Sequence, residues 1–347
     1  MPTESMAAVI HAPHDLRVEP VETPAPGHGE VLVRIRAGGI CGSDLHYHQH
    51  GGFGAVRLRQ PMVLGHEIAG EVAETGPGVT RVKPGDAVAV NPSRPCGACR
   101  YCREGAAHHC LEMRFLGSAM RMPHVDGGFR EHLVCTEAQA VPLPPGLPVQ
   151  RAAFAEPLAV CLHAARQAGP LLGRRVLVTG AGPIGALTIL VARLAGAREV
   201  VATDIAEAPL RLATRLGADH ALNTREAPEA LAPYGREKGH FDVVFEASGA
   251  AAALPAALMA ARPGATLVQL GIGGEVPLPV SLLVAKEITL RGTFRFLEEF
   301  EQAVEVLARG AIDVMPLLTA TFPLAEAPRA FAAAADRARN VKVQLAL

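Results

Sequence analysis

The sequence predicts an α/β protein of two domains, one β-rich and barrel-like and the other built on a doubly wound parallel sheet. Its 347 residues exceed the length, about 250 to 300 residues, at which a single hydrophobic core stops growing. Up to about residue 150, short β-like segments alternate with turn residues, as in an all-β unit. From about residue 151, buried strands alternate with helical segments, which indicates a parallel sheet.

Alternating hydrophobicity predicts the strands of the first domain. The stretch VLVRIRAGG places Val31, Val33 and Ile35 on one face and Arg34 and Arg36 on the other. Similar segments with turn residues beside them follow in EIAGEVAETGPG, KPGDAVAV and FREHLVC. Short strands separated by turns in this way predict a small barrel.

Buried strands and an apolar helix predict the second domain. RRVLVTG and EVVATD are expected to be strands with the helix PIGALTILVARLAG between them, and FDVVFEASG and ATLVQLG continue the alternation. The proline-rich segment 141–150 is the candidate linker. The tail beyond about residue 288 is expected to rejoin the first domain. We therefore predict one domain from 1–152 with 289–347, and a second from 153–288.

Composition and charge exclude several classes of protein. Hydrophobic residues make up 49% and charged residues 19%, below the roughly 25% of average domains, so the chain is globular rather than disordered. A net charge of -1 and a pI near 6.9 give no basic surface for a nucleic-acid backbone. The first residues lack a signal-peptide pattern, and apolar runs end short of the ~18 residues of a membrane span. We expect a cytoplasmic protein with no nucleic-acid or membrane partner.

Four of the seven cysteines stand close together in CGACRYCREGAAHHC. Cys96, Cys99, Cys102 and Cys110 are separated by two, two and seven residues. In a reducing compartment such a cluster is more often a metal site than a disulfide framework. Four thiolates form the closed tetrahedral shell of structural zinc, with no position open for a substrate. A redox CxxC pair is the alternative, but it does not explain Cys102 and Cys110.

A glycine-rich turn follows the first strand of the second domain, in VLVTGAGPIG. Gly180, Gly182 and Gly185 form G-x-G-x-x-G, where the first glycine allows the tight turn, the second lets a pyrophosphate approach and the third lets helix and strand pack closely. The helix that begins with Pro183 and Ile184 points its N-terminus at the phosphates. These five residues predict a dinucleotide site.

Asp204 ends the next strand, 22 residues after Gly182. A carboxylate at this position is expected to accept a hydrogen bond from the adenosine ribose 2′-hydroxyl. It would repel a 2′-phosphate, and no arginine follows it directly, so the sequence favours NAD over NADP. The alternative is a packing loop with a surface aspartate, which leaves the spacing unexplained.

Four further side chains are candidates for a second metal site. Cys41 lies in GGICGSDLHYH, His66 and Glu67 lie in VLGHEIAGEV, and Glu156 lies in FAEPLAV. A catalytic zinc takes about three protein ligands and keeps one position open for water or substrate. Each residue also has an ordinary structural interpretation, as a small buried thiol, a core histidine or a paired carboxylate. Spacing alone does not decide between the two.

Several motifs occur in the same order as in a known family. GHEIAGEV, CGSDLHYH, the four-cysteine segment, DGGF, AEPLAV and GAGPIG together resemble the zinc-dependent medium-chain alcohol and polyol dehydrogenase superfamily over nearly the whole chain. Within its sorbitol dehydrogenase-like branch, VNPSRPCGACRYC, MRFLGSAM, PHVDGGF and KEITLRGTFRF resemble the L-idonate 5-dehydrogenases. The resemblance implies a GroES-like catalytic domain and a Rossmann domain that binds NAD.

The resemblance also implies the roles of the metal-site residues. Cys41 and His66 would bind a catalytic zinc, and the third ligand would be Glu67 or Glu156, held directly or through water. Asp44 would hydrogen-bond the far nitrogen of His66 and so fix its tautomer.

A reaction follows from the same resemblance. Ser43 and His46 are similar to a proton relay, and with Glu156 they are the expected catalytic residues. Zinc favours loss of the substrate's hydroxyl proton, and hydride passes to the nicotinamide. The expected activity is oxidation of a secondary alcohol of a sugar acid, L-idonate to 5-keto-D-gluconate, with NAD or else with NADP.

Two alternative activities remain. A sorbitol- or xylitol-type polyol dehydrogenase would use the same zinc and dinucleotide sites. A zinc-independent reductase or structural protein on this architecture would lack the set Cys41, His66 and Glu156, and metal analysis would separate it from an enzyme with about two zinc ions per chain. The resemblance further implies a homodimer or homotetramer.

A sugar acid requires cations or hydrogen-bond donors for its carboxylate. Arg121, His124 and Arg295 lie in segments that the resemblance or the fold places near the substrate, as does Arg114. For Arg114 and Arg121, ordinary salt bridges are an equal explanation. Arg295 resembles an arginine that contacts polyols in the sorbitol branch, but Phe296 stands where that branch often has tyrosine. The loss of that hydroxyl argues against simple polyol recognition.

Overall fold

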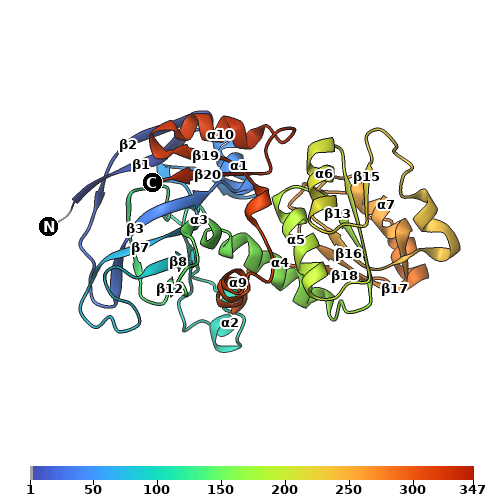
Figure 1. Ribbon diagram of the computed structural model, residues 1–347, viewed down its shortest axis with the longest axis horizontal. Coiled ribbons are helices and arrows are strands. Elements are labelled where there is room, and N and C mark those ends of the chain that lie inside the picture. The colour runs from blue at the N-terminus through green and yellow to red at the C-terminus, as the bar shows by residue number, and fades with distance from the viewer. Residues whose placement is uncertain (1–2) are drawn as a thin grey trace. The chain divides into compact units, whose positions relative to one another are not determined.

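The computed structural model describes residues 3–347, and the chain divides into two compact units (Figure 1). The first comprises the described residues up to Glu156 together with 300–336 and 342–347. The second comprises Pro157–Glu299 and Arg337–Val341. Each unit is therefore assembled from segments that are far apart in the sequence.

A seven-stranded sheet organises the described part of the first unit, in the order β12-β8-β7-β3-β20-β19, with β11 pairing with β3. Its strands are β3 (Glu30–Gly39), β7 (Glu67–Thr75), β8 (Ala87–Val90), β11 (His132–Thr136), β12 (Ala140–Pro142), β19 (Leu318–Pro323) and β20 (Lys342–Ala346). Val31, Val33 and Ile35 of β3 are fully buried, which confirms the face predicted from their alternation. Apart from the pair β19 and β20, the neighbouring strands are antiparallel, as expected for a β-rich domain.

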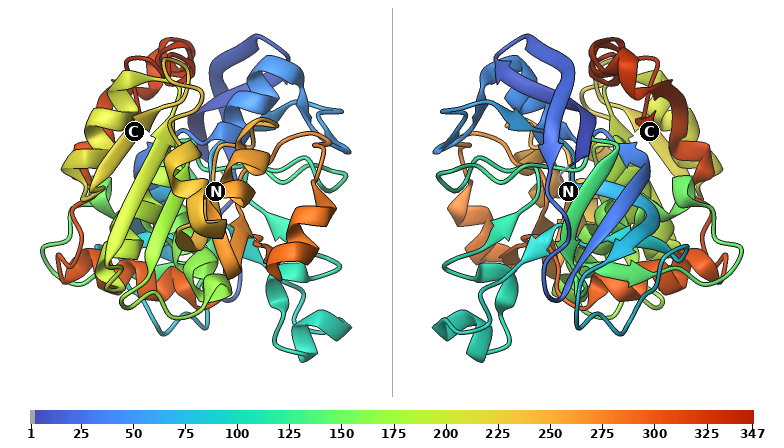
Figure 2. Two further views of the ribbon diagram at one scale, coloured as in Figure 1. Left: turned by 90° about the vertical axis from the view of Figure 1, so that its right-hand side faces the viewer. Right: turned by 90° about the vertical axis from the view of Figure 1, so that its left-hand side faces the viewer.

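Shorter strands and helices complete the first unit. They are the sheet of β1 (Thr3–Ala12), β2 (Asp15–Thr23) and β6 (Met62–Val63), the ribbon of β4 (Gly52–Phe53) and β5 (Val56–Arg57), the ribbon of β9 (Ser93–Arg94) and β10 (Arg114–Phe115), and the helices α1 (Gly42–His50), α2 (Arg100–Arg103), α3 (Val149–Ala152) and α10 (Ala327–Ala335), with α9 (Glu299–Ala308) at its border. The lobe that carries α2 protrudes from this unit in Figure 1 and in both panels of Figure 2.

The proline-rich segment 141–150, interpreted above as a linker, lies inside the first unit. It runs from the end of β12 into α3, and α3 packs against β3, β7 and β8 of the main sheet. The chain leaves this unit only after Glu156, within α4 (Ala155–Ala168). The prolines therefore stiffen a turn at the sheet and do not separate two domains.

The second unit contains a six-stranded parallel sheet in the order β15-β14-β13-β16-β17-β18. Its strands are β13 (Arg175–Thr179), β14 (Glu199–Asp204), β15 (His220–Asn223), β16 (Phe241–Glu246), β17 (Ala261–Gln269) and β18 (Thr289–Gly292). The main helices between them are α5 (Pro183–Leu194), α6 (Glu207–Arg215), α7 (Ala253–Ala260) and α8 (Val280–Lys286), which flank the sheet in the left panel of Figure 2. The order reverses beside β13, which is the topology of a doubly wound dinucleotide-binding fold.

The strand β18 corrects one detail of the predicted domain limits. Residues from 289 onward were expected in the first domain, but Thr289–Gly292 pair in parallel register with β17 and so extend the second unit's sheet. All four residues of β18 are exposed, so no alternation of buried and exposed positions could predict this strand from the sequence. Among the described residues, no helix is long and apolar enough to span a membrane.

Candidate active site

Two antiparallel strands bring the candidate catalytic residues together. β3 ends at Gly39, just before Cys41, and β7 begins at Glu67, next to His66. Gly39 and Glu67 are paired directly across the two strands. The strand pairing therefore gathers Cys41, His66 and Glu67 into one cluster, whose ligand atoms all lie within 4.8 Å of one another.

The carboxylate of Asp44 connects the two segments that carry these side chains. It is fully buried in the first turn of α1. Its Oδ2 accepts a hydrogen bond from the backbone N–H of Cys41 at 2.9 Å, and its Oδ1 accepts one from Gly65 at 3.3 Å. The same Oδ1 lies 3.7 Å from Nδ1 of His66, which is beyond hydrogen-bond distance. Asp44 thus orders the backbone beside both residues, and its bond to the imidazole stays a prediction.

The cluster fits the requirements of a zinc ion. Thiolate, imidazole and carboxylate are all accepted zinc ligands. His66 and Glu67 are buried, and Oε2 of Glu67 lies 2.5 Å from the ammonium of Lys342. Burial raises the pKa of the Cys41 thiol to about 11, so the sulfur needs a nearby cation to ionise near neutral pH. A divalent ion among these side chains would lower the pKa of that thiol and offset the negative charges of the thiolate and the carboxylate.

Glu156 lies at the start of α4, near this trio. Only 6% of the residue is exposed. Burial raises the pKa of Glu156 to about 8, and its charge interacts with His66, Glu67 and Cys41. A carboxyl group in that state is neutral until a cation favours its ionisation. Both glutamates therefore remain candidates for the third ligand position, and the choice between them stays a prediction.

A buried lysine, which the sequence did not indicate, completes the cluster. Nζ of Lys342 donates hydrogen bonds to Oε1 of Glu67 at 2.7 Å and to the carbonyl of Ile40 at 3.1 Å. Burial opposes the charge of Lys342, but Glu67 and Cys41 outweigh it and raise the lysine pKa. At Gly39, a Cβ atom would lie 2.2 Å from Oε2 of Glu67, so only glycine leaves room for this ion pair. Lys342 is 275 residues away from Glu67, and no local motif marks it.

The expected proton relay lies on α1. The Ser43 side chain lies near the sulfur of Cys41 and lowers the pKa of that thiol, although burial outweighs this effect and raises it. His46 is three residues further along the same helix and is therefore its neighbour on the helix surface. Its ring centroid lies 6.0 Å from that of Phe53. Both side chains are partly exposed, and this arrangement suits a path from the cluster towards solvent, although the relay itself stays a prediction.

The four cysteines of the protruding lobe converge between β9 and β10. Their sulfur atoms all lie within 4.8 Å of one another. Sγ of Cys99 is 3.6 Å from that of Cys102 and 4.0 Å from that of Cys110. A tetrahedral zinc ion with Zn–S bonds of about 2.3 Å requires sulfur separations of about 3.8 Å. Backbone N–H groups of Cys102 and Leu111 lower the pKa of Cys99 to about 6. The lobe is therefore shaped for a structural zinc ion.

The glycine loop has the shape required by a pyrophosphate. Gly180 has φ 85°, which favours glycine, and a Cβ at Gly185 would lie 1.8 Å from the carbonyl oxygen of Gly180. A Cβ at Gly182 would meet nothing within 4 Å, so this glycine borders open space. Gly182 caps α5, whose first turn contains Pro183 and Ile184, and no side chain caps this end of the helix. The backbone N–H groups of this turn suit a phosphate.

Asp204 lies at the end of β14, beside the glycine loop. Its Oδ2 accepts a hydrogen bond from the N–H of Ala181 at 2.7 Å, and its Oδ1 accepts one from Ala206 at 2.9 Å. Each carboxylate oxygen has a further lone pair for a ribose hydroxyl. The aspartate is therefore fixed where the sequence motif requires it.

Two of the candidate substrate residues are already engaged within the first unit. Arg121 forms an ion pair with Glu112 at 3.1 Å. His124 is buried, with Nδ1 2.8 Å from the carbonyl of Arg121 and Nε2 accepting from the N–H of Arg59 at 2.9 Å. Because both ring nitrogens are satisfied, the direct function visible for His124 is to order this loop.

Arg295 lies in the second unit and has an uncommon backbone. Its φ of 54° is in the left-handed region, which non-glycine residues rarely adopt. Its guanidinium lies 4.7 Å from the ring centroid of Phe294. Phe296, the next residue, is 2% exposed, so its ring packs inside the protein. Strained backbone of this kind is concentrated at functional sites, which keeps Arg295 a candidate.

Comparison with protein families agrees with this geometry. Residues 27–145 match the alcohol dehydrogenase GroES-like domain, and residues 183–309 match the zinc-binding dehydrogenase family. The first match contains the trio of Cys41, His66 and Glu67 as well as the four-cysteine lobe. The second contains most of the parallel sheet.

Individual relatives cover almost the whole chain. The L-idonate 5-dehydrogenase (NAD(P)(+)) of Escherichia coli (strain K12) is 44% identical over 315 residues, 90% of this chain and 91% of that protein. The sorbitol dehydrogenase of Gallus gallus is 37% identical over 346 residues, 99% of this chain and 96% of that protein. A crystal structure of the L-idonate 5-dehydrogenase of Escherichia coli str. K-12 substr. MG1655 superimposes with a TM-score of 0.94 at 41% identity, covering 100% of this chain and 99% of that one. The chain therefore belongs to the zinc-dependent medium-chain alcohol and polyol dehydrogenase superfamily, oxidoreductases whose cofactors are zinc and NAD(P).

Proposed function

We propose that this chain oxidises a secondary alcohol of a sugar acid, with L-idonate as the substrate and 5-keto-D-gluconate as the product. The cluster of Cys41, His66 and Glu67 is the observation that carries the reaction type, because three protein ligands leave the fourth position of a tetrahedral zinc to water or substrate. The 44% identity with an L-idonate 5-dehydrogenase supports the substrate. The first unit would act as the catalytic domain and the second as the dinucleotide domain.

The side chains of the first unit have distinct roles in this proposal. Cys41 and His66 hold the metal, with Glu67 or Glu156 as the third ligand. When bound, zinc supplies a Lewis acid that favours loss of the substrate's hydroxyl proton, and NAD⁺ supplies the hydride acceptor. Oγ of Ser43 accepts the proton and releases its own to the ring of His46, one turn further along α1.

NAD is the proposed cofactor rather than NADP. The carboxylate of Asp204, fixed by Ala181 and Ala206, would accept hydrogen bonds from a ribose hydroxyl and repel a 2′-phosphate. Ile205 follows it in the sequence, so the adjacent residue provides no cation for such a phosphate.

Arg295 is the proposed partner of the substrate's carboxylate. A guanidinium can bind a carboxylate through two parallel N–H groups, which a neutral polyol does not require. The left-handed backbone at this position holds the side chain in a direction that an ordinary extended or helical residue would not give. Arg121 and His124 remain weaker candidates because Glu112 and the backbone already engage them.

A polyol such as sorbitol is the second candidate substrate. The 37% identity with the sorbitol dehydrogenase of Gallus gallus, over 99% of this chain, supports it. Both activities would use the same metal cluster, so only the contacts to the end of the substrate distinguish them.

A substrate panel tests the proposal. We expect kcat/KM with NAD⁺ to be at least tenfold higher for L-idonate than for sorbitol or xylitol, since a charge-assisted hydrogen bond contributes about 1.5 to 3 kcal/mol and tenfold corresponds to about 1.4 kcal/mol. Arg295→Gln should remove this preference, and Arg121→Gln serves as the control arginine. Equal or better turnover of sorbitol would make the enzyme a polyol dehydrogenase. The same panel with NADP⁺ tests the cofactor.

We also propose that the enzyme works in the cytoplasm as a homodimer or homotetramer. None of the seven cysteines, all of which are described, forms a disulfide, which suits a reducing compartment. Light scattering of the purified protein at several concentrations measures the number of subunits.

A further inference from the structure

A two-stranded ribbon forms the base of the four-cysteine lobe. β9 leads into the lobe and β10 leads out of it. Arg94 and Arg114 are paired directly across these two antiparallel strands, and Ser93 is paired with Phe115. Side chains at directly opposed positions lie close together, and two like charges there are destabilising. The ribbon therefore carries an electrostatic cost.

Neither arginine forms an ion pair that would offset that cost. Neither Arg94 nor Arg114 has an ion pair or side-chain hydrogen bond with any described residue, and both are exposed. Glu112 lines an adjoining cavity with both arginines, but the ion pair that its carboxylate forms is with Arg121. An anion from outside the chain would relieve the repulsion between the two unpaired guanidinium groups.

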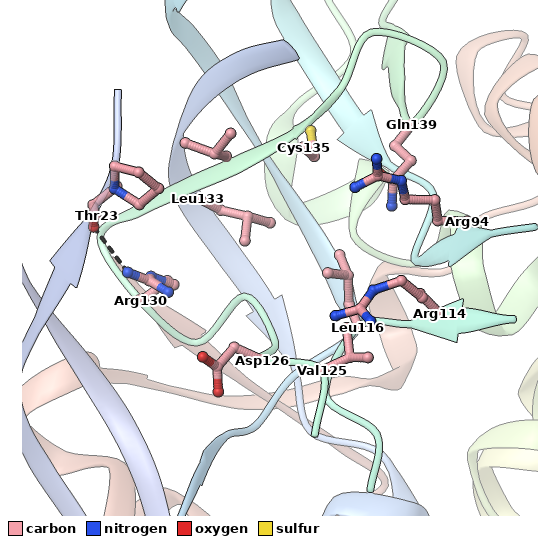
Figure 3. Close-up of a pocket in the computed structure, with 12 residues that line it drawn as sticks. Thr23, Arg94, Arg114, Leu116, Val125, Asp126, Arg130, Leu133, Cys135 and Gln139 are labelled. Carbon is pink, nitrogen blue, oxygen red and sulfur yellow. Dashed lines mark hydrogen bonds between the residues drawn. The ribbon is translucent and has the colours of Figure 1, made fainter. Parts of the chain in front are cut away.

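The two arginines face a cavity of about 210 Å³ within the first unit. Figure 3 shows their side chains reaching into it from β9 and β10. Leu116, Val125 and Leu133 give part of its wall an apolar surface. The cavity has room for a phosphate group together with a short carbon chain.

A third guanidinium lines the same cavity from deeper in the protein. Arg130 is 7% exposed, and it donates hydrogen bonds to Oγ1 of Thr23 at 2.8 Å and to the carbonyl of Glu22 at 2.9 Å (Figure 3). Its Nε is buried and has no hydrogen-bond partner. The only carboxylate in the lining is Asp126, whose Oδ1 accepts from the N–H of Val63 at 2.9 Å. Three arginines against one aspartate leave the cavity positive.

We propose that this cavity binds a small anion of the phosphate class, either free phosphate or the phosphate group of an organic ester. Arg94 and Arg114 would bind its oxygens through their planar N–H groups, which match phosphate geometry. Arg130 provides a fixed positive charge behind them. The site is separate from the dinucleotide loop, which lies in the second unit.

The ribbon also packs against the cluster of Cys41, His66 and Glu67. Successive side chains of a strand point to opposite faces, so Phe115 faces away from the side that carries Arg114. The ring centroid of Phe115 lies 5.6 Å from that of His66. An anion that neutralises the ribbon therefore stabilises an element that packs directly against a candidate zinc ligand.

Thermal unfolding of the zinc-loaded full chain tests the proposal. Saturating NAD⁺ keeps the glycine loop filled, and inorganic phosphate or ribose 5-phosphate is titrated in against chloride at constant ionic strength. We expect a saturable rise in Tm, roughly 3 to 8 °C at about a hundred times Kd. The ligand with the lower half-saturation concentration shows whether free phosphate or an ester is preferred.

Two variants make the test specific. Arg94→Gln and Arg114→Gln should each abolish the phosphate-dependent rise, and without phosphate their Tm should equal or exceed that of the wild type because the opposed charges are gone. Arg59→Gln, an exposed arginine of the same unit that does not line the cavity, should keep the full rise. The proposal fails if no saturable rise occurs, if both cavity variants retain it, or if they lose stability without phosphate. None of these outcomes bears on oxidation of the sugar acid.

Discussion

At the scale of single residues, the charge balance of the metal site depends on Lys342. This one buried lysine interacts with three acidic side chains, those of Cys41, Glu67 and Glu156. The side chain of Lys342 is 3% exposed and that of Glu67 is 1% exposed, so neither charge is screened by water. Removing one partner of such a pair leaves the other charge buried and uncompensated.

Lys342→Met should therefore destabilise the first unit strongly. We expect a loss of about 3 to 5 kcal/mol in the free energy of unfolding, measured by urea denaturation. The double variant Lys342→Met with Glu67→Gln should recover most of this loss, because it also removes the buried carboxylate that the single variant leaves unpaired. If the double variant is no more stable than the single one, the contact is not an energetic pair.

Motifs identified the metal-site residues from the sequence, whereas long-range contacts remained hidden. The four lobe cysteines are recognisable from their spacing, whereas Cys41 and His66 were identified only through the resemblance to a known family. The structure brings each group together. Lys342 has no such signal, since it is one lysine in a short apolar strand. No sequence pattern marks Gly39 either, because its missing side chain is needed only to leave room for Glu67 on the neighbouring strand.

At the scale of elements, the four-cysteine lobe has almost no core of its own. Its helix α2 contains no buried residue, and of the four sulfur-bearing residues only Cys110 is buried. A zinc ion in the tetrahedral sulfur shell would therefore provide most of the order in this lobe.

Cys102→Ser should release one of the two expected zinc ions per chain. Metal analysis should show a fall of about one zinc, and trypsin should cleave the variant faster at Arg100 or Arg103, which lie in α2. Cys135→Ser is the matched control, because Cys135 is buried in β11 outside both clusters and should leave the zinc content unchanged. An unchanged zinc content in Cys102→Ser would show that this lobe holds no metal.

The elements also show where sequence patterns succeed and fail. Alternation predicted β3 because every second residue of its first part is buried. Apolar runs predicted β13, β14 and the helix α5 because these elements are buried on almost all sides. β18 has no buried residue, and only its pairing with β17 makes it a strand. The proline-rich segment was misread because prolines favour turns of every kind, those inside a domain included.

At the scale of the whole molecule, each unit has a separate hydrophobic cluster. In the first unit it includes Ile35, Phe129 and Phe331, and in the second it includes Leu177 and Phe241. The two clusters share no residue. The β-rich first part of the sequence and the alternating strands and helices of the second part predicted two cores. No local pattern shows that 337–341 return to the second unit between segments of the first.

Calorimetry should therefore resolve two unfolding transitions. NAD⁺ at about a hundred times Kd should raise the transition of the second unit by roughly 5 to 10 °C, since ligand binding stabilises only the unit that holds it. A zinc chelator should lower the transition of the first unit and leave the other in place. One transition that moves equally with both treatments would show that the units unfold as a single cooperative block.

The pairing of β20 with β3 has a consequence for biosynthesis. Glu67 and Lys342 are 275 residues apart, and at about 5 to 20 residues per second a ribosome needs roughly 15 to 55 seconds to synthesise the chain between them. Throughout that interval the nascent Glu67 has no lysine beside it, and the sheet has an open place next to β3. The buried ion pair beside the candidate zinc ligands therefore forms only after residue 342 has been translated.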